Sequence, residues 1–227
     1  MAATHSYGFD ILLAQMGASI DVMRMRWSMV DRIQVREEWL AKAERADVIV
    51  FDLDGTLVDS DYANYLAYKD AVMSVLSTQI EIDFTLGTRI TRDLLEELIP
   101  AITHKQLDEI ALLKERLYHK FLSETETSPR LIEMVARVQD KEVVLATNSR
   151  RCRAEMLLNH HGLIEKFTRK IYRDAESQRD KYVQLMAELP KGSMSILVFE
   201  NDKKAIESAV ACGIGIDQII DVSRIPR

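Results

Sequence analysis

This chain contains very little cysteine. Cys152 and Cys212 are its two cysteines among 227 residues, and they form no CxxC pair. Such a pattern predicts neither a disulfide framework nor a zinc site of the usual spacing. We expect reduced thiols, which are typical of proteins in the cytoplasm.

Long apolar runs and an excess of basic residues are missing as well. No apolar run approaches the roughly 20 residues that a membrane-spanning helix needs. Asp10 and Asp21 interrupt the apolar segment near the N-terminus, which argues against a signal peptide. A formal net charge of −6 gives no indication of a basic patch for nucleic acid. We therefore predict a cytoplasmic protein that partners neither a membrane nor a nucleic-acid polymer.

The C-terminal half alternates apolar strand patterns with helical ones. The expected strands are EVVLAT (142–147), KIYR (170–173), SILVF (195–199) and IDQIIDV (216–222), and helical patterns lie before and between them. Such alternation with short links is typical of an α/β fold with a doubly wound parallel sheet. Ligands bind at the carboxyl ends of the strands in these sheets.

The stretch VIVFDLDGTLVDS (48–60) carries the strongest chemical signal. Its apolar start predicts a strand over 47–51 that is buried on both faces. Unpaired carboxylates are costly to bury, so we expect Asp52 and Asp54 at the strand's end, facing a ligand or a cation. Gly55 allows the chain to turn there.

A helical block separates this first strand from the others. The segment from residue 61 to about 124 has helical periodicity and no strong strand signal. We therefore predict an α/β core formed by residues 47–62 and 125–227, an inserted α-helical cap over 63–124, and a helical N-terminal extension over 1–46.

Two carboxylates at a strand end permit phosphoryl-transfer chemistry. Asp52 can attack phosphorus and form an aspartyl-phosphate, while Asp54 can protonate the leaving oxygen and later activate water. The Thr56 hydroxyl can orient Asp54 by a hydrogen bond. Anions that attack an anionic phosphate need positive charge nearby, which Mg²⁺ and a lysine can supply.

The sequence DLDGTLVDS resembles the first motif of the haloacid dehalogenase-like (HAD) superfamily, and the resemblance extends over about residues 46–227. LATNSR (145–150) is similar to the second motif and implies that Thr147, with Asn148 beside it, binds the phosphate. RDKYVQLM (179–186) resembles the third motif, which implies that Lys181 neutralises the phosphate. Tyr182 stands where relatives usually carry proline, so Lys170 is the alternative.

LVFENDKKAIESAVACGI (197–214) is similar to the fourth motif, which completes the Mg²⁺ site. Relatives usually carry Glu-Asp-Ser, whereas this chain carries Glu200-Asn201-Asp202. The resemblance implies metal ligation by Asp52, the Asp54 carbonyl and Glu200 or Asn201. Asp202 either compensates for the missing charge of Asn201 or serves only as a helix N-cap.

The helical block resembles the cap of the beta-phosphoglucomutase and phosphoglycolate phosphatase branch. LGTRITRDLLEEL (86–98) resembles its specificity segment, so Arg89 or Arg92 is a candidate contact for a substrate anion. In beta-phosphoglucomutase a histidine stands at about the position of Asn64. Its absence here makes a phosphomutase the weaker alternative.

The sequence therefore predicts a Mg²⁺-dependent phosphatase that acts on a small phosphorylated metabolite. A weakly active or inactive relative with a binding or regulatory role is the alternative from another class, and Asn201 and the long extension motivate it. The Met-rich segment over 16–29 favours a helix packed on the core or a homodimer contact through the N-terminal extension.

Overall fold

A computed structural model describes residues 37–77, 90–173, 179–189 and 195–224. The chain divides into two compact units, residues 1–44 and residues 45–227. In the first unit the described residues are helical. The predicted dimer segment over 16–29 lies outside the described residues. The second unit contains the sheet and every element discussed below.

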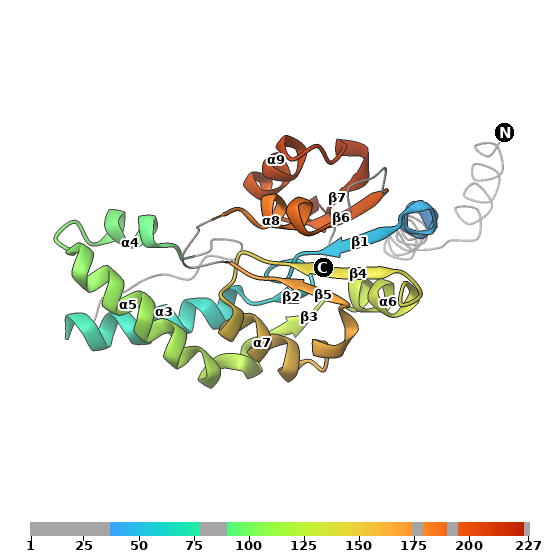
Figure 1. Ribbon diagram of the computed structural model, residues 1–227. Helices are drawn as coiled ribbons and strands as arrows, with labels where there is room; N and C mark the ends of the chain where they lie inside the picture. Colours follow the sequence, from blue (N-terminus) through green and yellow to red (C-terminus); the bar gives the residue numbers. More distant parts are fainter. Residues whose placement is uncertain (1–36, 78–89, 174–178, 190–194, 225–227) are drawn as a thin grey trace, which may run out of the picture. The chain divides into compact units, whose positions relative to one another are not determined.

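A five-stranded parallel sheet forms the centre of this second unit (Figure 1). The strands lie in the order β5-β4-β1-β6-β7. Their bounds are Val48–Phe51 for β1, Glu142–Ala146 for β4, Arg169–Ile171 for β5, Ile196–Glu200 for β6 and Ile219–Asp221 for β7. Strand order reverses at β1, since β4 and β6 lie on its two sides. The predicted α/β fold with a doubly wound parallel sheet is confirmed.

Helices cover both faces of the sheet. Val48 and Val50 of β1 pack in one apolar cluster with residues of α8 (Lys181–Glu188) and α9 (Lys203–Ala211). Helices α6 (Pro129–Arg137) and α7 (Arg151–His160) lie on the opposite side in Figure 1. Every residue of β1 is buried, as a central strand of a parallel sheet requires.

The helical insertion is the described part of residues 61–124. It comprises α3 (Asp61–Leu76), α4 (Arg92–Leu98), α5 (His104–Leu117) and the 3₁₀ helix η1 (Tyr118–Glu124). Helices α3, α4 and α5 share an apolar cluster of their own, which includes Tyr65, Leu95 and Ile110. Thr103 and Gln106 form a capping box that starts α5.

Two short strands join the insertion to the sheet-bearing core. β2 (Val58–Asp59) pairs antiparallel with β3 (Glu126–Thr127). Two residues are too few to produce a strand pattern in the sequence, so this ladder was not predicted. The expectation of a strand over 216–222 was too long, because Ile216–Gln218 forms a 3₁₀ turn before β7. No helix in the described part of the chain is long and apolar enough to cross a membrane.

Candidate active site

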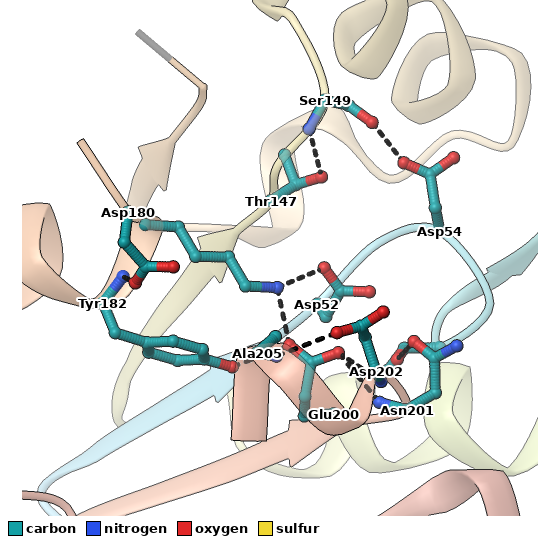
Figure 2. A network of polar contacts seen from close by, with 12 residues as sticks. Asp52, Asp54, Thr147, Ser149, Asp180, Tyr182, Glu200, Asn201, Asp202 and Ala205 are labelled. Carbon is teal, nitrogen blue, oxygen red and sulfur yellow. Dashed lines mark hydrogen bonds and ion pairs between the residues drawn. The ribbon is translucent and has the colours of Figure 1, made fainter. Parts of the chain in front are cut away.

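The carboxyl ends of β1, β4 and β6 open into a cavity of about 460 Å³. Its described lining consists of mostly polar residues: Asp52, Asp54, Gly55, Asp61, Thr147, Asn148, Ser149, Lys181, Glu200, Asn201, Asp202, Lys203, Val222 and Ser223. Sequence reasoning predicted that the polar residues after these three strands would meet, and the structure brings them together (Figure 2).

The turn that follows β1 places the first two carboxylates. Gly55 has a φ of 82°, a left-handed conformation that glycine adopts without strain. The Gly55 amide donates to the Val58 carbonyl at 2.7 Å, and the Val58 amide donates to the Leu53 carbonyl at 2.9 Å. These hydrogen bonds close a tight loop, so Asp52 and Asp54 extend from a rigid backbone.

Asp52 contacts a buried lysine. The Lys181 ammonium donates to Asp52 Oδ1 at 2.6 Å and to Glu200 Oε2 at 2.5 Å. Lys181 is 1% exposed and Asp52 is 5% exposed, so water screens this contact little. The structure therefore brings Lys181, at the start of α8, to the predicted nucleophile. The alternative, Lys170, donates to the Phe167 carbonyl and is not among the lining residues.

Glu200 at the end of β6 is fully buried and surrounded by donors. Its Oε2 accepts from Lys181 and, at 2.8 Å, from the Tyr182 hydroxyl. Its Oε1 accepts from the backbone amides of Asn201 at 2.9 Å and Asp202 at 3.0 Å. Four donors hold this carboxylate, so Glu200 serves as a fixed counter-ion for Lys181.

Burial and neighbouring charges change the proton affinities of these groups. Burial, reinforced by the Glu200 carboxylate, raises the pKa of Asp52 to about 7 against the attraction of Lys181. Burial works against the Lys181 ammonium, but Asp52 and Glu200 outweigh it and raise the pKa of Lys181. Lys181 is therefore charged throughout the physiological range.

Asp54 has a separate set of partners. Arg153 of α7 donates from its two terminal nitrogens to Asp54 Oδ1 at 3.0 Å and Oδ2 at 3.2 Å. The Ser60 hydroxyl donates to Oδ1 at 2.6 Å, and the Ser149 hydroxyl donates to Oδ2. Figure 2 shows the Asp54 side chain directed toward Ser149. The two aspartates therefore have different electrostatic surroundings despite their spacing.

Thr56 has another partner than the expected one. We expected its hydroxyl to orient Asp54, but it donates to Asn201 Oδ1 at 3.0 Å. Ser60 and Ser149 supply hydroxyl hydrogen bonds to Asp54. Thr56 thus fixes the side chain of Asn201 over the turn at Gly55.

Thr147 and Asn148 follow β4 and line the cavity. Thr147 is 1% exposed, and its Oγ1 accepts from the Ser149 amide at 3.1 Å. This hydrogen bond leaves the hydroxyl proton of Thr147 available for a ligand. Asn148 is exposed at the mouth of the site.

Residues with carboxylate and amide oxygens line the cavity, and such oxygen atoms suit Mg²⁺. No group of three or more His, Cys, Asp or Glu side chains in the described ranges is placed to hold a metal ion. Asp52 and Asn201 nevertheless line one cavity, and Mg²⁺ commonly uses one or two carboxylates with substrate phosphates. Asp202 is exposed, and its Oδ1 accepts from the Ala205 amide as the N-cap of α9.

The two predicted cap arginines are not both in the described chain. Arg89 lies outside the described residues. Arg92 of α4 pairs with Asp108 of α5 at 2.7 Å and is not among the lining residues. A contact from either arginine to substrate stays a prediction.

Several residues of the site were given no role from the sequence, and three of them contact its charged groups. Arg153 lies on a helix that pattern analysis places in the core, and a charge with helical spacing usually faces solvent. Ser149 lies in the segment LATNSR (145–150), in which roles were given only to the two residues before it. Tyr182 was noted because it follows Lys181, and that unusual residue was the one available signal for its contact with Glu200.

The family model of haloacid dehalogenase-like hydrolases matches residues 46–215. The chain belongs to this family. This confirms the predicted superfamily, whose members generally use Mg²⁺. The matched range contains the first strand, the helical insertion and every described lining residue of the cavity except Val222 and Ser223.

Solved structures share the fold at low sequence identity. A putative phosphatase from Clostridium difficile has a TM-score of 0.63 and 18% identity, covering 78% of this chain and 85% of that one. CbbY from Rhodobacter sphaeroides, solved with phosphate, has a TM-score of 0.62 and 17% identity, covering 74% and 84%. A putative phosphoglycolate phosphatase from Lactobacillus plantarum has a TM-score of 0.61 and 15% identity, covering 74% and 84%. At these identities the likeness establishes the fold alone.

Proposed function

We propose that this protein is a Mg²⁺-dependent phosphatase that hydrolyses a small phosphorylated metabolite. The observation that carries the proposal is the pairing of Asp52 with buried Lys181 at the end of β1, with Thr147 lining the same cavity. A carboxylate, an ammonium and a hydroxyl in one cavity match the needs of phosphoryl transfer.

The proposed reaction has two displacements at phosphorus. In the first, a carboxylate oxygen of Asp52 attacks, the bond to the ester oxygen breaks, and Asp54 gives that oxygen a proton. In the second, water attacks phosphorus, Asp54 accepts the proton of this water, and the Asp52–phosphorus bond breaks. Inorganic phosphate leaves, and both carboxyl groups return to their starting forms.

Other residues of the chain bind the phosphate and the metal. Lys181 balances the charge of the transferring phosphoryl group, and Thr147 donates a hydrogen bond to it. Asp52, the Asp54 carbonyl oxygen and Asn201 would hold Mg²⁺, with Asp202 as a further candidate ligand. When bound, Mg²⁺ supplies positive charge that stabilises the transition state at phosphorus.

The helical insertion is proposed to act as a cap that excludes water and selects the leaving group. The phosphomutase alternative gains no support from the residue at position 64, where beta-phosphoglucomutase has a histidine. Asn64 is buried here, and its side-chain amide donates to the Ile90 carbonyl at 3.3 Å. A cytoplasmic location and a homodimer through the N-terminal extension stay predictions.

A binding or regulatory protein with little activity is the second candidate. The neutral Asn201 and the four donors on Glu200 favour it, because both reduce the negative charge available to a metal. Activity decides between the two candidates.

The test is turnover on a panel of phosphorylated sugars, nucleotides and three-carbon acids, with Mg²⁺ or with EDTA. Asp52→Asn is the variant at the nucleophile, and Asp140→Asn, at a described position outside the site, is the matched control. We expect turnover that needs both Mg²⁺ and Asp52 and that survives in the control.

Turnover of no compound by a folded protein would reject the phosphatase and favour the binding role. Turnover that persists in Asp52→Asn would reject Asp52 as the nucleophile. Trapping of a phosphorylated chain by acid quench, followed by mass spectrometry of the peptide that contains Asp52, checks the intermediate directly.

A further inference from the structure

The carboxylate of Asp54 is held by a buried guanidinium that does not line the cavity. Arg153 is 4% exposed, and its two terminal nitrogens contact one oxygen each of Asp54, at 3.0 and 3.2 Å. The same guanidinium donates to the Ser149 hydroxyl. A two-point contact of this kind sets both the position and the rotation of a carboxylate.

Arg153 is itself fixed from the side of the helical insertion. Its guanidinium carbon lies 5.2 Å from the ring centre of Tyr118 in η1. Tyr118 is fully buried. Stacking of a guanidinium on an aromatic face is favourable, and more so away from water. Arg153 therefore connects the start of the core helix α7, the insertion and Asp54.

We propose that Arg153 is a positioning residue for the reaction of Asp54. The inference rests on the proposed phosphatase function and adds a residue to it. Arg153 is not among the residues that line the cavity, so it acts on the substrate through Asp54. It orients the carboxylate that takes a proton from the attacking water in the second displacement.

A purely structural role accounts less well for this arrangement. A buried ion pair gives little net stability compared with apolar residues of similar volume. Its geometry is strictly defined, however, and proton transfer depends on geometry, because small displacements of a catalytic group reduce the rate strongly. The serine hydroxyls of Ser60 and Ser149 complete the hydrogen bonds on both oxygens of Asp54.

A double-mutant cycle tests the proposal with the full chain, Mg²⁺ and p-nitrophenyl phosphate. The variants are Arg153→Met, Asp54→Asn and both together. We expect Arg153→Met to lower kcat by about tenfold or more with little change in KM. Added to Asp54→Asn, it should lower kcat no further, because its effect passes through Asp54.

Two further variants separate positioning from folding. Arg153→Lys keeps the charge but cannot make the two-point contact, so kcat should recover only in part. Arg137→Met removes an arginine from the exposed pair with Glu133 on α6, and kcat should not change. If Arg153→Met does not fold, Tyr118→Leu replaces it in the cycle, since it removes the ring that fixes the guanidinium.

Each outcome has a definite meaning. An unchanged kcat in folded Arg153→Met, or a loss that simply adds to that of Asp54→Asn, would overturn the positioning role and leave the phosphatase standing. A wild-type protein without activity on p-nitrophenyl phosphate and on every compound of the panel described above would overturn both proposals together. A lower melting temperature with the wild-type kcat would assign Arg153 to stability alone.

Discussion

Asp52 and Asp54 are two residues apart and have unlike partners. Lys181 donates hydrogen bonds to both Asp52 and Glu200. Asp54 instead accepts hydrogen bonds from Arg153 and from two serine hydroxyls. Burial is the main reason why the pKa of Asp52 is raised, and the negative charge of Glu200, which shares Lys181 with Asp52, adds to the effect. The environments separate a nucleophile from an acid-base group.

The raised pKa of Asp52 predicts a pH-dependent effect of Asp52→Asn on stability. The unfolded chain releases the Asp52 proton near the ordinary pKa of 3.8, and the folded chain releases it near 7. Wild-type stability should therefore fall as pH rises through this window, by roughly 1–3 kcal/mol. The amide has no such proton to lose.

Melting temperatures of both proteins between pH 4 and pH 8.5 in EDTA check this expectation. Asp52→Asn should be the more stable protein at pH 8, and the difference should vanish near pH 4. A difference that is constant over the range would contradict the raised pKa. Asp140→Asn again serves as the control.

At the scale of elements, the turn between β1 and β2 defines the geometry of the cavity. Gly55 and Gly162 both have left-handed φ values, 82° and 67°. They differ in their surroundings. A Cβ at Gly55 would lie 2.4 Å from Asn201 Nδ2, whereas a Cβ at Gly162 would meet nothing within 4 Å.

This difference predicts that Gly55→Ala and Gly162→Ala share a loss of stability but not a loss of activity. Each places an alanine in the left-handed region, at a cost of roughly 1–2 kcal/mol. In Gly55→Ala, Asn201 must also move off Thr56, so turnover should fall by about tenfold or more. Chemical denaturation and steady-state kinetics measure the two effects, and equal activity in both variants would refute the role of the turn.

At the scale of the whole molecule, metal and phosphate should stabilise the fold together. Lys181 and Arg153 already neutralise Asp52, Glu200 and Asp54 in part, and Asn201 adds no charge. A divalent cation alone therefore finds little unshared negative charge. A phosphate group supplies charge and oxygen ligands at the same place, and a ligand that binds the folded chain raises its melting temperature.

We expect Mg²⁺ and inorganic phosphate together to raise the melting temperature by more than the sum of their separate effects. Asn201→Asp should increase the response to Mg²⁺ alone, because it restores an anionic ligand. Asn159→Asp, on the exposed face of α7, adds the same charge outside the site and should not. Strictly additive shifts in the wild-type protein would argue against this coupling.

Much of the fold and part of the candidate site could be predicted from the sequence alone. The apolar run before Asp52 predicted a buried parallel strand, and the alternation of strands and helices predicted the sheet. Both could be predicted because burial produces a continuous apolar run in a strand buried on both faces and a periodic apolar pattern in a helix with one buried face. The polar residues at three strand ends predicted that Asp52, Thr147 and Glu200 would meet, since parallel strands end at one edge of a sheet. Lys181 was implied only by the resemblance to the HAD superfamily, with Lys170 as the alternative.

Only the tertiary structure decided the partners within the site. Thr56 contacts Asn201 and not Asp54, Tyr182 contacts Glu200, and Arg153 reaches Asp54 across 99 positions of the chain. These are single contacts between side chains from different elements, and they depend on helix rotation and side-chain direction. Local sequence periodicity determines neither the rotation of a helix nor the direction of a side chain. Packing of the insertion and of α7 against the turn after β1 therefore determines which charged side chains form pairs.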